Sequence, residues 1–225
     1  DVMTTDEYLK KRAKTPSEIW LAEYQQEPID LKGRLFSEIN IIALDEYKRR
    51  IGVDPNDQRN NARKTLVDGF IAYIDVADEG KDYTAMALAS IVGNRVYIID
   101  YLFTRANTDV AIPLAAAMLD KYGVQYCRVE SNNMGAMFAR LLQKKTKTRI
   151  LQVRNSTNKM TRIIMQSAFI LNNFEFVETQ GAQCSQFLAN VESFSKEGKN
   201  KNDDAPDTLA GLAMFIASMF KNVDW

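Results

Sequence analysis

The sequence predicts an α/β protein with a mixed sheet of five strands flanked by helices. Three strand-like runs come first, at 70–74, 83–92 and 95–103, rich in β-branched and aromatic residues and separated by short turns. Helical and strand-like segments then alternate as far as residue 153. Short turns make the first three strands antiparallel, whereas helical crossovers make the last two parallel to their neighbours.

The first strand ends in an aspartate that requires explanation. The run Phe70–Ile74 is too short for a helix, leads directly into Asp75 and is followed by a polar turn at 78–82. The next connection centres on Gly93-Asn94, which suits a tight type I′ or II′ turn. An ionised carboxylate loses several kcal/mol of hydration on burial unless donors or a cation replace the water. Asp75 therefore bonds the amides of its own hairpin or binds a metal ion.

Two helix–strand units extend the sheet. Asn107 can cap a helix from Val110 to Tyr122 that Gly123 closes, and the following strand, 124–129, ends in Glu130. A right-handed crossover places this strand beside the first and parallel to it. The remaining elements are expected as a helix at 134–144, a fifth strand at 149–153, and helices near 160–171, 182–191 and 206–220.

Residues 1–65 are predicted to form an N-terminal arm or linker, and residues 66–225 the main domain. The arm should hold a helix with Ile19, Trp20 and Tyr24 on one face, an extended piece at 31–36 and a short helix near 42–50. Because the chain starts at Asp1 and not at Met, we expect it to be a fragment or a processed form of a longer protein.

Composition excludes several classes of chemistry. The chain has no histidine, so histidine bases and histidine zinc sites are absent. Cys127 and Cys184 are too few for a disulfide framework and fit a reducing compartment. Net charge is zero, so only local clustering can indicate a nucleic-acid binder. No run of apolar residues approaches the roughly 18 residues needed to span a membrane.

The acids at the strand ends suggest a metal centre. Asp75 and Glu130 should meet at the carboxyl edge of two parallel strands, where ligand sites of α/β sheets lie. Asp204 and Asp207 lie at the start of the last predicted helix. Their presence there also has a structural explanation, because Asp204 can cap the helix and Asp207 is favoured by the positive helix end. An all-carboxylate set favours Mg²⁺ or Mn²⁺, and two such ions roughly 4 Å apart can cleave a phosphodiester. Asp100, on the third strand, is expected at the sheet edge with a structural role.

Basic residues near this edge are candidates for DNA binding. The segment 144–162 contains seven lysines and arginines and no acid, so it can track a phosphate backbone or simply form a solvated face. A lysine in the first hairpin and another in the loop before Asp204 add to the set. The candidate DNA-binding residues are Lys81, Arg154, Lys159, Arg162 and Lys199.

Several segments resemble one known family. The motifs Tyr73-Ile74-Asp75, Val129-Glu130-Ser131-Asn132 and Asp203–Ala210, together with the upstream segments 20–24 and 33–36, are similar to the C-terminal nuclease domain of the large terminase subunit of tailed bacteriophages. The resemblance spans nearly the whole chain. It implies an RNase H-like fold and an endonuclease that cuts concatemeric double-stranded DNA by a two-metal-ion mechanism. Because the sequence has few signatures that read bases, we expect low sequence specificity.

The resemblance also implies roles and partners. Asp75 would bridge two Mg²⁺ or Mn²⁺ ions, Glu130 and Asp207 would each hold one, and Asp204 would be an accessory ligand. The catalytic set would be Asp75, Glu130 and Asp207. Expected partners are double-stranded DNA, the terminase ATPase domain of the same polypeptide, the portal and the small terminase subunit, with no membrane. The expected location is the cytoplasm of an infected bacterial cell.

Three other interpretations remain open from the sequence. A resolvase or transposase core would use the same acids. The hairpin after Asp75, with Gly80 and Thr84, is similar to the phosphate hairpin of actin-like ATPases, although no second such hairpin is found. A non-catalytic docking module of the packaging machinery would use the acids only as caps and turn partners. Metal-dependent DNA cleavage would separate the nucleases from the docking module.

Overall fold

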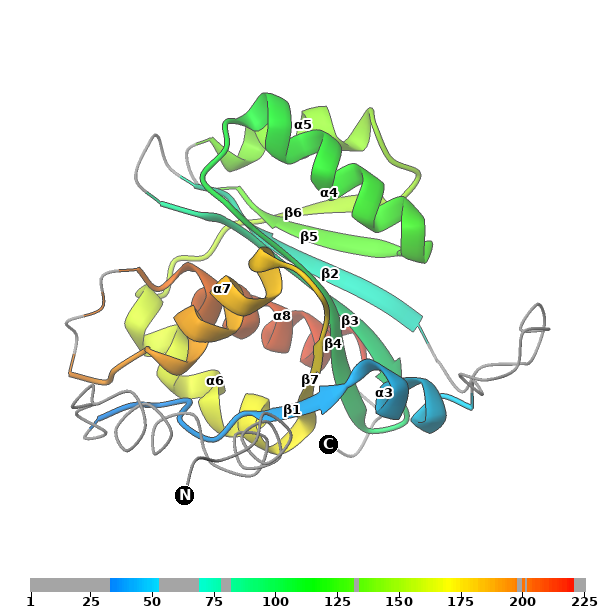
Figure 1. Cartoon of the computed structure of the whole chain (residues 1–225). Coiled ribbons are helices and arrows are strands. Elements are labelled where there is room, and N and C mark those ends of the chain that lie inside the picture. The colour runs from blue at the N-terminus through cyan, green and yellow to red at the C-terminus, as the bar shows by residue number, and fades with distance from the viewer. Residues whose placement is uncertain are drawn as a thin grey trace, which may run out of the picture.

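A seven-stranded mixed sheet forms the centre of the protein, with helices on both faces (Figure 1). The structure is a computed structural model and describes residues 33–52, 69–77, 82–131, 134–197, 200 and 202–220. Its strands are β1 (Asn40–Ala43), β2 (Gly69–Asp75), β3 (Thr84–Val92), β4 (Arg95–Thr104), β5 (Tyr126–Glu130), β6 (Arg149–Val153) and β7 (Phe174–Glu178). Its helices are α3 (Leu44–Arg50), α4 (Thr108–Tyr122), α5 (Gly135–Gln143), α6 (Lys159–Asn173), α7 (Ala182–Glu192) and α8 (Asp204–Met219).

The sheet has the predicted centre and two additional strands. The strand order is β1-β7-β4-β3-β2-β5-β6. Strands β2, β3 and β4 are antiparallel, and β5 pairs in parallel with β2, which confirms the α/β fold and this adjacency. Gly93 has a φ of 58°, as the tight turn between β3 and β4 requires. The predicted count of five strands was wrong, because β1 and β7 lengthen the sheet beyond β4.

The missed strand β7 explains one further correction. Strand β7 follows α6 without a loop, so in the sequence its short run cannot be told apart from the end of the helix. It pairs with Val96–Ile98 of β4. Strand β4 is therefore interior, and the prediction that Asp100 lies at a sheet edge was wrong. Asp100 accepts hydrogen bonds from Lys121 and Tyr122 at 3.1 and 3.0 Å.

Part of the predicted arm packs onto the sheet. Strand β1 pairs with β7, and the side chains of Leu35 and Phe36 are buried in the core. The expected extended piece at 31–36 is, in its described part, a turn with one bridge between Arg34 and Ser195. The helix around Ile19–Tyr24 lies outside the described residues. The domain boundary near residue 65 stays a prediction.

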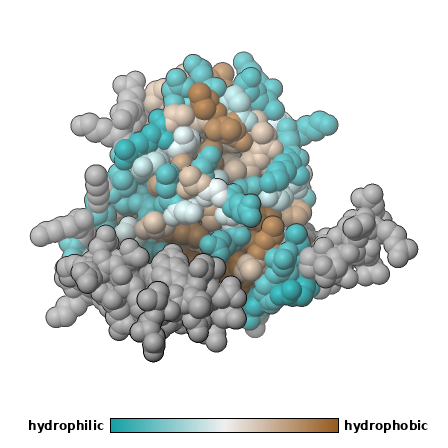
Figure 2. All heavy atoms as spheres, viewed as in Figure 1, coloured by the Kyte–Doolittle hydropathy of each residue, from teal (hydrophilic) through white to brown (hydrophobic). Residues whose placement is uncertain are grey.

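Each face of the sheet has its own core. Helices α6, α7 and α8 cover one face, and α4 and α5 cover the other (Figure 1). Along β2, Ile71 and Tyr73 face α8 while Ala72 and Ile74 face α4 and α5, as the two-residue period of a strand requires. Asp75 continues the α8 side. Apolar side chains gather on the outside of α4 and α5 (Figure 2), where Val110, Leu114, Met137 and Leu141 are exposed.

Gly135 lets helix α5 begin directly against the end of β5. A Cβ atom at this position would lie 1.8 Å from the carbonyl oxygen of Glu130. Because the neighbouring atom belongs to the backbone, it cannot move without displacing the strand end that carries Glu130. Glycine is therefore required for this close approach.

We expect Gly135→Ala to lower the free energy of unfolding by about 1–3 kcal/mol or more, because the added methyl overpacks a backbone contact. Urea denaturation of the two chains measures the difference. Gly69→Ala is the matched control, since a Cβ there would be 3.7 Å from the nearest atom, an ordinary contact. Equal stability of Gly135→Ala and the wild type would contradict this account.

Candidate metal centre

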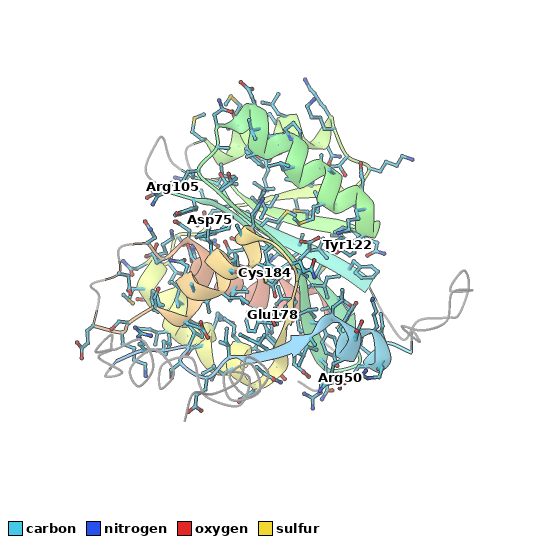
Figure 3. All side chains as sticks on the ribbon, viewed as in Figure 1. Arg50, Asp75, Arg105, Tyr122, Glu178 and Cys184 are labelled. Carbon is cyan, nitrogen blue, oxygen red and sulfur yellow. The ribbon has the colours of Figure 1, made fainter. Side chains whose placement is uncertain are left out.

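Three carboxylates from distant parts of the sequence meet at one end of the sheet. Asp75 and Glu130 are the last residues of the parallel neighbours β2 and β5, and Ile74 is in register with Val129. Asp207 lies in the first turn of α8, which crosses beneath β2 and β3. One oxygen from each carboxylate lies within 4.8 Å of the others. Figure 3 shows Asp75 at this end of β2, with Tyr122 near the opposite end of the strand.

Helix capping does not account for the acids of α8. The N-cap residue is Asp203, and its side chain makes no capping hydrogen bond. Asp204 instead accepts a hydrogen bond from the backbone N–H of Tyr83 at 3.1 Å, which ties α8 to the start of β3. Asp207 is 1% exposed and is bound by an arginine. The alternative role predicted for Asp75 was to accept hydrogen bonds from the amides of its own hairpin. The Ala77 amide in this hairpin donates to Thr84 Oγ1.

Two cations from the start of α6 face the acids. Lys159 Nζ lies 3.4 Å from Asp75, 3.1 Å from Asp203, 3.4 Å from Asp204 and 3.5 Å from Asp207. Arg162 binds both oxygens of Asp207, at 2.8 and 2.6 Å, and reaches Glu130 at 3.2 Å. The two residues are three positions apart on one helix, so both point to the same side.

Glu130 is held by several donors. Its Oε2 accepts hydrogen bonds from the hydroxyl of Tyr73 at 3.2 Å and from Asn155 Nδ2 at 3.0 Å, besides Arg162. Asn155 also donates to the Tyr73 hydroxyl at 2.9 Å. Burial raises the pKa of Tyr73, so its hydroxyl stays protonated and remains a donor. Glu130 thus has a fixed orientation.

The electrostatics of the site disfavour so many buried negative charges. Burial raises the pKa of Asp75 to about 8; Lys159 opposes this shift, whereas the charges of Asp207, Glu130 and Asp204 add to it. Burial likewise raises the pKa of Asp207 to about 6, against the opposing effect of Lys159 and Arg162. The pKa of Lys159 is raised, because its carboxylate neighbours outweigh its own desolvation. The centre carries more negative charge than its two cations balance.

The side chains fit a divalent cation with oxygen ligands. The three clustered donors are all carboxylate oxygens, and their spacing of at most 4.8 Å matches oxygens that share one ion at roughly 2.1–2.4 Å from each. Neither cysteine takes part, since Cys127 and Cys184 are buried elsewhere in the cores. The donor set therefore suits Mg²⁺ or Mn²⁺ better than a softer metal.

The basic segment 144–162 divides into two parts. Lys144, Lys145, Lys147 and Arg149 lie around the start of β6, at the end of the sheet opposite to Asp75. Arg154 follows the end of β6 on the same side as the acids and is exposed. Lys159 and Arg162 are engaged by carboxylates, and Arg162 is 4% exposed, so its position does not support contact with DNA. Lys81 and Lys199 lie outside the described residues.

Sequence reasoning gave Tyr73 no role of its own and did not single out Asn155. Tyr73 is two positions before Asp75 on the same strand, so the period of two places both side chains on one face. Asn155 follows the end of β6, at the carboxyl edge where the acids gather. The two-residue spacing of Tyr73 and Asp75 could be seen in the sequence. The contacts of Tyr73 and Asn155 with Glu130 depend on the tertiary packing.

The fold and the site together define an RNase H-like α/β protein with an acidic centre at the carboxyl edge of its sheet. The family model described as "Terminase RNaseH-like domain" matches residues 72–218. The chain belongs to this family, and the resemblance inferred from the sequence is confirmed. No curated protein matches the chain.

Solved structures with a similar fold come from terminases. The large terminase of the thermophilic bacteriophage D6E has a TM-score of 0.52 and 8% identity, over 97% of this chain and 53% of that one. The human cytomegalovirus terminase nuclease domain, Mn soaked and inhibitor bound, has a TM-score of 0.49 and 12% identity. The match covers 76% of this chain and 93% of that one. A mutant nuclease domain of the large terminase subunit of bacterial virus Sf6, with manganese and β-thujaplicinol, has a TM-score of 0.47 and 10% identity. The match covers 75% of this chain and 92% of that one.

We expect Arg162→Ala to destabilise the metal-free chain by about 3–5 kcal/mol, because it leaves the buried carboxylates of Asp207 and Glu130 without their guanidinium partner. Chemical denaturation in chelator measures the loss. Arg49→Ala is the control, since the pair of Arg49 with Glu46 is exposed and worth at most about 1 kcal/mol. Losses of equal size would refute a structural role for Arg162.

Asp75 should give the chain a defined pH dependence of stability. Its folded pKa of about 8 exceeds its ordinary value of 3.8, so between these values the native state binds more protons than the unfolded state. The free energy of unfolding should then fall as pH rises, by up to about 1.4 kcal/mol per pH unit for this group. Urea denaturation in chelator between about pH 5 and pH 8 measures the fall, and Asp75→Asn should make it shallower. An unchanged slope would exclude Asp75 as its source.

Proposed function

We propose that this chain is the metal-dependent endonuclease domain of a phage DNA-packaging terminase, which cuts concatemeric double-stranded DNA with low sequence specificity by a two-metal-ion mechanism. The observation that carries the proposal is the convergence of Asp75, Glu130 and Asp207, with oxygens within 4.8 Å, in a member of the terminase RNase H-like family. Only oxygen donors form the cluster, so the cofactor would be Mg²⁺ or Mn²⁺.

Each carboxylate has a separate role in this proposal. The oxygens of Asp75, Glu130 and Asp207 lie within 4.8 Å of one another. As the resemblance to terminase nucleases implies, Asp75 would bridge two ions, and Glu130 and Asp207 would each hold one. Bound there, the two ions would activate a water molecule and stabilise the leaving oxygen of the phosphodiester. Asp204 would be accessory, because one of its oxygens is already committed to the Tyr83 amide. The products would carry a 5′-phosphate and a 3′-hydroxyl.

The surrounding residues would hold the centre and approach DNA. Arg162 fixes Asp207 and Glu130 from within the protein. Lys159, whose side chain is 36% exposed, faces both the acids and solvent and is suited to meet a phosphate at the centre. Arg154, exposed at the same edge, would contact the backbone farther along the duplex. Both contacts would go to the phosphate backbone, which carries no sequence information directly, so low sequence specificity is expected.

The family also supports proposals about partners and location. In a packaging motor the chain would work with the terminase ATPase domain of the same polypeptide, the portal and the small terminase subunit, in the cytoplasm of an infected bacterium. Within the described residues, no helix is both long enough and apolar enough to span a membrane.

Asp75→Ala should abolish cutting while the fold survives, because it removes the bridging ligand. Supercoiled plasmid is incubated with the purified chain and Mn²⁺ or Mg²⁺, or with chelator, and nicked and linear products are resolved on a gel. The matched control is Asp45→Ala, an exposed aspartate on α3 paired with Lys48, which should cut normally. Circular dichroism confirms folding of each variant.

The result separates the competing functions. Cleavage that needs both metal and Asp75 supports the nuclease. A folded wild-type chain that neither cuts DNA nor binds the metals would favour a docking module of the packaging machinery. Cleavage by Asp75→Ala at the wild-type rate would refute the proposed centre.

A further inference from the structure

Tyr73 and Asn155 form a closed hydrogen-bonded unit with Glu130. The Tyr73 hydroxyl donates to Glu130 Oε2 at 3.2 Å, Asn155 Nδ2 donates to the same oxygen at 3.0 Å, and Asn155 also donates to the Tyr73 hydroxyl at 2.9 Å. The three residues come from β2, from the loop after β6 and from the end of β5. Two separate segments, β2 and the loop after β6, therefore hold one carboxylate oxygen at the end of β5.

The position of the Tyr73 hydroxyl is set by packing. The ring is 2% exposed and lies between the sheet and α8. A Cβ atom at Gly211 of α8 would be 2.2 Å from Cζ of this ring, so the helix passes as close as a glycine allows. A ring held this tightly keeps its hydroxyl oxygen beside Glu130.

Three side-chain donors bond the same oxygen of Glu130, Oε2. A carboxylate oxygen offers about two lone pairs, and Oε2 already receives donors from Tyr73, Asn155 and Arg162. This oxygen is thus committed to protein contacts. A carboxylate fixed in this way keeps its orientation before a cation arrives, so less conformational freedom is lost on binding.

We propose that Tyr73 and Asn155 are positioning residues that hold Glu130 in the orientation needed to bind a divalent cation. The inference rests on the proposed metal centre and deepens it. Both residues act through Glu130 and not by touching the ion. Tyr73 is otherwise a core tyrosine, and the test must separate the two roles.

Tyr101 provides a matched control for the loss of a buried hydroxyl. It is also 2% exposed, and its hydroxyl donates to the backbone carbonyls of Ile98 and Val177, at 2.9 and 3.1 Å. It contacts none of the acids of the centre by these bonds. Tyr101→Phe should therefore lower the thermal stability about as much as Tyr73→Phe does, without changing the centre.

The experiment measures Mn²⁺ binding to the 225-residue chain by electron paramagnetic resonance of the free ion and by calorimetry, without DNA. We expect Tyr73→Phe and Asn155→Ala each to weaken Mn²⁺ binding about tenfold or more, and Tyr101→Phe to leave it unchanged. Because both residues serve one oxygen, the double variant should lose less affinity than the product of the two single losses. Thermal melting in chelator gives the stability of each chain.

Each outcome decides the matter. Weakened binding in Tyr73→Phe but not in Tyr101→Phe, at similar melting temperatures, supports the positioning role, even if the wild type cuts no DNA and the proposed nuclease function fails. Wild-type affinity in Tyr73→Phe overturns the inference while the proposed metal centre stands. Independent, fully multiplicative losses overturn the shared action on Glu130. A wild-type chain that binds no Mn²⁺ overturns both this inference and the proposed centre.

Discussion

The arrangement of the site depends on two cations that project from one side of α6. Lys159 and Arg162 are the charges that allow Asp75, Glu130, Asp203, Asp204 and Asp207 to lie together in a mostly buried place. The bidentate pair of Arg162 with Asp207 joins α6 to α8, and its third contact joins both helices to the end of β5. Removing one side of such a pair costs far more than its net contribution to stability. Helices and sheet are therefore aligned by charge as well as by apolar packing.

This balance is incomplete, and that is informative about function. The raised pKa values of Asp75 and Asp207 show that burial and mutual repulsion outweigh the nearby lysine and arginine. A protein selected only for stability would replace some of these acids with apolar residues. Carboxylates retained at such a cost, at the carboxyl edge of an α/β sheet, are typical of a functional site.

The centre of the fold could be predicted from local patterns, whereas its edges could not. Short turns and crossover rules were enough to place β5 beside β2, and hence Glu130 beside Asp75. Strand β7 could not be foreseen, because it continues α6 without a break and carries a glutamate, Glu175, that is buried only because Arg50 and Arg95 reach it from elsewhere. The structure brings the three principal acids together within 4.8 Å, and their role as metal ligands stays a prediction. Their positioning by Tyr73, Asn155 and Arg162 depends on contacts between segments that no sequence period connects.

The contribution of α8 affects when the site can exist during synthesis. Asp207 belongs to the last described element in chain order, and the same helix packs against Tyr73 and forms much of one core. Strands β2 and β5 can pair earlier, but they then bring together only two of the three acids. A chain still on the ribosome thus lacks the complete centre until α8 has left the exit tunnel and docked.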